Sequence, residues 1–191
     1  MLVALWFMVG LNLVFWRSVV DGLGPLNKGS IFFIAGLPVF VFIWLYLLLS
    51  LLAWGRLTKI LLGGFLLVSA AASYFISSYG IVIDHSMLAN VMQTDSAEVF
   101  DLLTWRLALW MLCLGLVPVL LLSRVEVLDR GWRRETIAKL ASMTLLLLCM
   151  GGIVMSQYKS YASLIRNHRE VRLLLVPSNV VAAVHGYLKR A

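Results

Sequence analysis

Residues 31–54 read IFFIAGLPVFVFIWLYLLLSLLAW, an apolar run without a single charged residue. The hydrocarbon core of a bilayer is about 30 Å thick, so roughly 20 such residues cross it as a helix. Pro38 lies inside the run, and within a membrane helix a proline usually bends the helix locally instead of ending it. The run therefore predicts a transmembrane helix with a kink near Pro38.

Four more apolar runs predict helices of similar length, at about residues 2–20, 60–79, 107–123 and 137–157. The 191-residue chain is 62% hydrophobic and 13% charged, and its mean hydropathy is +0.95. A soluble domain carries about 25% charged residues. The sequence thus predicts an all-α membrane protein with five transmembrane helices joined by amphipathic connections, and it excludes a soluble fold.

The basic residues of the short loops indicate the orientation of the helices. Arg56, Lys59 and the cations of 124–139 fall on one side, whereas Arg17, Lys28 and Arg106 fall on the other. Because cytoplasmic loops carry the excess of Lys and Arg, the N-terminus is expected inside and the C-terminus outside. The basic tail after residue 157 argues for the opposite orientation, and we give more weight to the short loops.

The interiors of the five runs lack ionisable side chains. They hold no Asp, Glu, Lys, Arg or His, which argues against an ion-coupled transporter. Asn12 is their main strongly polar residue, and an interhelical hydrogen bond is favoured over a ligand site. Small residues permit close helix approach, so we expect contact lines at Gly63-Gly64, at residues 69–73 and at Gly151-Gly152.

The connection 80–106 gathers polar residues. Within it, residues 83–94 predict an amphipathic helix lying along the membrane, with Ser86 as its cap. Asn90, Thr94 and Glu98 recur at every fourth position, so one continuous helix would place them on one face. That face suits an amine-bearing head group, with Glu98 as the countercharge. Two alternatives stay open: a solvated face, and a helix restarting at residues 95–98 with Glu98 as a cap partner.

The tail 158–191 is the second polar segment. Residues 158–169 are basic and aromatic, which suits an anionic membrane surface, and the sequence 177–179 predicts the start of a last helix over 180–189. A nucleic-acid partner is not expected, because the tail lies outside the cell in this topology and has no such motif. The chain contains no serine triad, phosphate loop or Cys/His metal pattern, so neither a catalytic centre nor a metal site is expected in it.

Four short segments carry a resemblance to a known family: SYFISSYGIVID (73–84), MLANVMQTDSAE (87–98), YKSYASLIRNHRE (158–170) and VPSN (176–179). They resemble the membrane domain of the phosphoethanolamine–lipid A transferases, a family that includes the mobile colistin resistance enzymes. The resemblance covers essentially the whole chain, and it implies that the connecting helices are periplasmic.

The resemblance also implies a function. In this family five helices in the inner membrane precede a periplasmic domain, in which a zinc-activated threonine moves phosphoethanolamine from phosphatidylethanolamine to lipid A. The added group weakens the binding of cationic polymyxins. Asn90, Thr94 and Glu98 match family residues that hold the head group. The threonine and the zinc ligands have no counterpart in this chain, which we therefore expect to be inactive alone.

The expected organisation is a membrane domain over 1–157, including the periplasmic loop 80–106, and a basic periplasmic segment over 158–191 that begins a linker to a catalytic domain. The N-terminus is expected in the cytoplasm and the C-terminus in the periplasm. A freestanding lipid-binding or scaffold protein of the membrane is the rival, and the gene beyond codon 191 separates the two. The acceptor, lipid A phosphate or core sugar, stays open.

Overall fold

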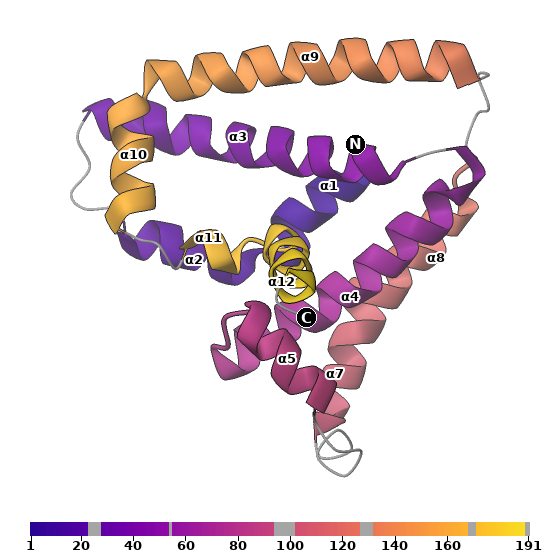
Figure 1. Ribbon diagram of the computed structural model, residues 1–191. Helices are drawn as coiled ribbons and strands as arrows, with labels where there is room; N and C mark the ends of the chain where they lie inside the picture. The colour runs from indigo at the N-terminus through magenta and orange to yellow at the C-terminus, as the bar shows by residue number, and fades with distance from the viewer. Residues whose placement is uncertain (23–27, 54, 94–101, 127–131, 168–170, 190–191) are drawn as a thin grey trace.

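The computed structural model describes residues 1–22, 28–53, 55–93, 102–126, 132–167 and 171–189, and every regular element in these ranges is helical (Figure 1). Four helical segments there are long and apolar enough to cross a membrane, and counting one bent pair of helices as a single span brings the number to five. The predicted fold class, an all-α membrane protein with five spans, is confirmed.

The first span is broken in its middle. It consists of α1 (Leu2–Trp6), a π-helical turn (Phe7–Leu11) and α2 (Leu13–Gly22), with a bend of 62° between its two halves. Asn12 leaves the helical conformation at the break, with φ −114° and ψ 31°. The prediction of one continuous helix over 2–20 is therefore wrong. The break is tolerated because side chains hydrogen-bond the freed carbonyl groups, as described below.

The second and fifth spans are continuous helices. The helix α3 (Lys28–Leu52) passes through Pro38 without ending, as predicted. The helix α9 (Trp132–Ser156) runs beside α3 at the edge of the bundle (Figure 1). None of its spanning residues is buried by the rest of the described chain. Gly151 and Gly152 are accordingly exposed, so the contact line predicted there is wrong for this chain alone.

The third and fourth spans pack closely together. They are α4 (Thr58–Tyr79) and a run made of α7 (Trp105–Trp110), a π-helical turn (Met111–Leu116) and α8 (Val117–Arg124). A Cβ atom added at Gly115 would lie 3.2 Å from Leu67 Cδ2 and 3.3 Å from Ala70 Cβ. Gly63 faces Val119 of α8 in the same contact between the two spans, which we call the seam. Gly63 and Ala70 thus lie in the predicted contact line on α4, whereas Gly64 is exposed and a Cβ atom there would meet no atom within 4 Å, so that part of the prediction is wrong for this chain alone.

The tail belongs to the core of the bundle. It forms α10 (Tyr158–Asn167), which contacts α3 and α9, then α11 (Val171–Leu174), which contacts α2, and α12 (Ser178–Leu188), which contacts α5 (Figure 1). Tyr161 of α10 is only 5% exposed, and its ring centroid lies 5.0 Å from that of Phe33 and 5.3 Å from that of Phe40. The tail is therefore part of the packed membrane domain.

Candidate functional site

The connection after the third span contains the predicted amphipathic helix, α5 (His85–Gln93). Gly80 ends α4 with φ +64°, a conformation that glycine adopts without a steric penalty. Asp84 then caps α5, because its carboxylate accepts hydrogen bonds from Met87 N at 2.9 Å and Ser86 Oγ at 2.6 Å. The helix is confirmed, but the predicted cap at Ser86 is wrong. The carboxylate of Asp84, two residues earlier, reaches the free backbone N–H.

The predicted head-group residues are only partly placed. Asn90 lies in the last turn of α5 with an exposed side chain. Thr94 and Glu98 lie outside the described residues, as does the predicted restart of the helix at residues 95–98. Their common face therefore stays a prediction.

The tail helix α12 supports α5. The two helices are in close contact near the end of α4, which we call the α5 end of the bundle (Figure 1). A small apolar cluster joins α4 to the tail at this end, with Ala72, Ile76 and Val176 buried and Ile83 and Val180 packed against them. The amphipathic helix thus has a protein support, where the sequence predicted a helix lying along the membrane.

Two side chains bridge the break in the first span to its neighbours. Asn12 is 1% exposed, and its Nδ2 donates to Phe7 O at 2.8 Å and to Val176 O at 2.6 Å. Val176 N donates to Asn12 Oδ1 at 2.7 Å. Ser73 Oγ of α4 donates to Leu11 O at 2.8 Å. Asn12 makes the structural hydrogen bonds that were favoured over a ligand site, and its partner outside the span is the backbone before α12.

Two further side chains hold the start of α12. Asn179 is 1% exposed, and its Nδ2 donates to Leu173 O at 3.0 Å. Trp44 Nε1 of α3 donates to Ser178 Oγ at 2.8 Å. The sequence 177–179 predicted a helix start, but the burial of Asn179 had no signal in local sequence. Together with Asn12, these bonds fix the support of α5 to both the first and the second span.

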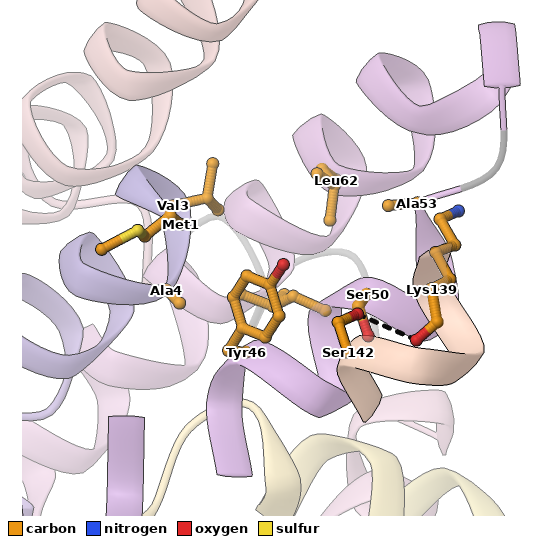
Figure 2. Close-up of a pocket in the computed structure, with 10 residues that line it drawn as sticks. Met1, Val3, Ala4, Tyr46, Ser50, Ala53, Leu62, Lys139 and Ser142 are labelled. Carbon is orange, nitrogen blue, oxygen red and sulfur yellow. Dashed lines mark hydrogen bonds between the residues drawn. The ribbon is translucent and has the colours of Figure 1, made fainter. Parts of the chain in front are cut away.

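The opposite end of the bundle has a cavity of about 170 Å³ (Figure 2). Met1, Tyr46, Ser50 and Lys139 are among the residues that line it, and Ser142 Oγ donates there to Lys139 O at 2.9 Å. The ammonium group of Lys139 forms an ion pair with Glu135 at 3.2 Å. The N-terminus thus lies at the end of the bundle where α4 begins, about 33 Å along α4 from the α5 end.

Acidic, histidine and cysteine side chains are dispersed. Across the described ranges, no three of them lie close enough to share a metal ion. Cys113 and Cys149 are exposed free thiols on separate spans. On α10 the cations Lys159 and Arg166 point outward, while Tyr161 points into the core.

These features define a multi-pass, helical integral membrane domain whose tail holds an amphipathic helix at one end of the spans. A sequence profile described as "Phosphoethanolamine transferase EptA/EptB" matches residues 41–191. The chain belongs to this family, which confirms the resemblance seen in its motifs.

Individual relatives agree with the family match. The chain is 35% identical to phosphoethanolamine transferase EptA of Salmonella typhimurium, over 96% of this chain and 34% of that protein. It is 32% identical to phosphatidylethanolamine transferase Mcr-2 of Escherichia coli, with the same coverage. The structure of the integral membrane enzyme EptA from Neisseria meningitidis matches 98% of this chain and 35% of its own, with a TM-score of 0.91 and 35% identity. The chain thus spans about a third of the length of these relatives.

Proposed function

We propose that this chain is the membrane part of an enzyme that transfers phosphoethanolamine from phosphatidylethanolamine to lipid A, and that it positions the donor lipid. Membership of the transferase family supports the proposal, as does the alignment of nearly the whole chain with relatives named for this activity. The modified lipid A would bind polymyxins more weakly, because its phosphate charge is neutralised.

The observation that carries the proposed role is the position of α5. The helix is capped by Asp84, supported by α12 and exposes Asn90 at the end of the spans. A carboxamide offers both donors and an acceptor, so it can hydrogen-bond the phosphodiester and the amine of one head group. In this proposal Thr94 adds a hydroxyl contact and Glu98 balances the charge of the ammonium.

The proposed setting is the inner membrane, with the N-terminus in the cytoplasm and the C-terminus in the periplasm. The cations near the Met1 end support this orientation, since Lys59, Lys139 and the arginines at 124, 133 and 134 border the two connections there. The α5 end then faces the periplasm. The family resemblance assigns the zinc and the threonine nucleophile to a separate periplasmic domain, which would receive the head group from α5.

A chimera tests the proposal. This chain replaces the matching third of the Salmonella relative, and the chimera is expressed in a polymyxin-sensitive host that lacks its own transferase. We expect mass spectrometry of lipid A to show an added phosphoethanolamine and the cells to survive polymyxin. A well-expressed, membrane-inserted chimera without the added mass would contradict the proposal and favour a lipid-binding or scaffold protein.

A further inference from the structure

A second cavity, of about 380 Å³, lies at the α5 end of the seam between α4 and the fourth span. Its wall includes Tyr74 and Ser78 from α4 and Arg106, Leu109, Trp110 and Cys113 from the fourth span. This volume is within the range of sites for small ligands. Neither the predicted head-group residues nor the proposed transfer step uses this cavity.

The cavity is charged at one end and apolar at the other, so it matches a ligand with a charged head group and an apolar tail. Arg106, Leu109, Trp110 and Cys113 follow one another at helical spacing, so they occupy one face of the fourth span. The guanidinium stands at the end of the span, 5.9 Å from the centroid of the Trp105 ring, and the apolar side chains lie one and two turns deeper. Ser78, an exposed residue of α4, lines the same cavity. The described lining contains no acidic residue, so the net charge of the cavity is positive.

The indole of Trp110, which lines the same cavity, carries a hydrogen-bond donor without a partner among the described residues. Its Nε1 is buried and has no acceptor among the described residues. The neighbouring hydroxyl of Tyr74 is already paired with Thr104 Oγ1 at 2.9 Å, and its ring meets the indole edge-on at a centroid distance of 6.0 Å. A buried donor without a partner is costly, so an acceptor delivered by a ligand would be stabilising.

We propose that this cavity binds a glycerophospholipid. The phosphodiester pairs with the guanidinium of Arg106, an ester carbonyl accepts from Trp110 Nε1, and an acyl chain lies along Leu109 and Cys113. Arginine favours phosphate because it makes paired, charge-assisted hydrogen bonds. This site binds the phosphate and the ester of the lipid and makes no contact with an amine. The inference therefore does not depend on the donor site proposed on α5.

Native mass spectrometry of the purified protein in detergent tests this inference. Phosphatidylglycerol is titrated in, and diacylglycerol with the same acyl chains serves as the ligand without phosphate. We expect Arg106→Gln to raise the dissociation constant for phosphatidylglycerol at least fivefold and to leave that for diacylglycerol unchanged. Trp110→Phe should weaken both ligands, because both carry the ester.

Two matched variants complete the experiment. Arg166→Gln removes another exposed arginine, from α10, and should leave phosphatidylglycerol binding unchanged. Val91→Ala, an exposed change on α5 at a residue outside the proposed donor site, should also leave it unchanged. The inference is overturned if Arg106→Gln behaves as Arg166→Gln does, if diacylglycerol responds equally to Arg106→Gln, or if Trp110→Phe binds both lipids as the parent protein does.

Discussion

The carboxamide of Asn12 and the backbone of Val176, 164 positions apart in the chain, form two hydrogen bonds of 2.6 and 2.7 Å. Both residues are 1% exposed. The bonds join the break in the first span to the segment that precedes α12, and α12 supports α5. A polar residue in the interior of a membrane span thus determines where the proposed donor-binding helix is held.

Asn12→Leu should destabilise the domain by at least about 2 kcal/mol, because it leaves the N–H and C=O of Val176 and the C=O of Phe7 buried without their partner. We expect a lower thermal unfolding midpoint in detergent and faster trypsin cleavage in α10. Ser77→Ala, an exposed change on α4, is the control. An unchanged midpoint and an unchanged cleavage rate would show that other contacts hold the tail.

The cap of α5 gives a second prediction. Asp84→Ala removes the acceptor of Met87 N and should destabilise α5 locally by about 1 kcal/mol. Asp84→Asn keeps a side-chain oxygen there and should behave as the parent protein does. Hydrogen exchange of the α5 backbone amides measures the difference. Equal exchange in the two variants would contradict the assignment of the cap.

Local sequence predicted the spans well, and the reason is physical. A bilayer demands about 20 apolar residues per helix, so α3, α4 and α9 could be placed within a few residues. The break at Asn12 could not be predicted, because it depends on a partner 164 positions away. Gly151 and Gly152 were wrongly predicted to form a helix contact, because small residues permit another helix to approach but do not show that one is there.

In the candidate site, too, local sequence predicted the helix but not its distant partners. The amphipathic pattern located α5, because a polar face repeats with the period of a helix. Its support by α12 was not predicted, because the sequence indicates a last helix near residues 180–189 but not what that helix packs against. Asn179 carried no local signal of burial, and its role follows from the fold of the tail. The roles of Thr94 and Glu98 stay predictions.

The seam between the third and fourth spans gives a third prediction. Gly115→Ala places a methyl group 3.3 Å from Ala70 Cβ, which has no flexible end to move away. Such overpacking should cost about 1–3 kcal/mol and lower the unfolding midpoint. Gly152→Ala on the exposed face of α9 meets no atom within 4 Å and is the matched control. Equal midpoints for the two variants would contradict this packing.

Tyr161 gives a prediction that depends on pH. Burial raises the pKa of its phenol above the usual 10.0, so the folded state favours the neutral form. The free energy of unfolding should therefore fall as the pH rises above about 10. Tyr161→Phe should remove that part of the pH dependence and keep the ring between Phe33 and Phe40. Denaturation in detergent from pH 9 to pH 11 measures both, and an identical pH profile for the variant would contradict the assignment.

Asn90 provides the direct test of the donor site, in the chimera with the Salmonella relative. If its carboxamide binds the head group, Asn90→Ala should reduce lipid A modification about tenfold, which corresponds to the loss of a hydrogen bond to a charged group. Val91→Ala, the exposed neighbour on the same helix, is the control. Phosphoethanolamine on lipid A is quantified by mass spectrometry at matched expression. Since α5 is supported by α12 and capped by Asp84, neither substitution should unfold it. Full modification in Asn90→Ala would therefore assign this face of α5 to solvent.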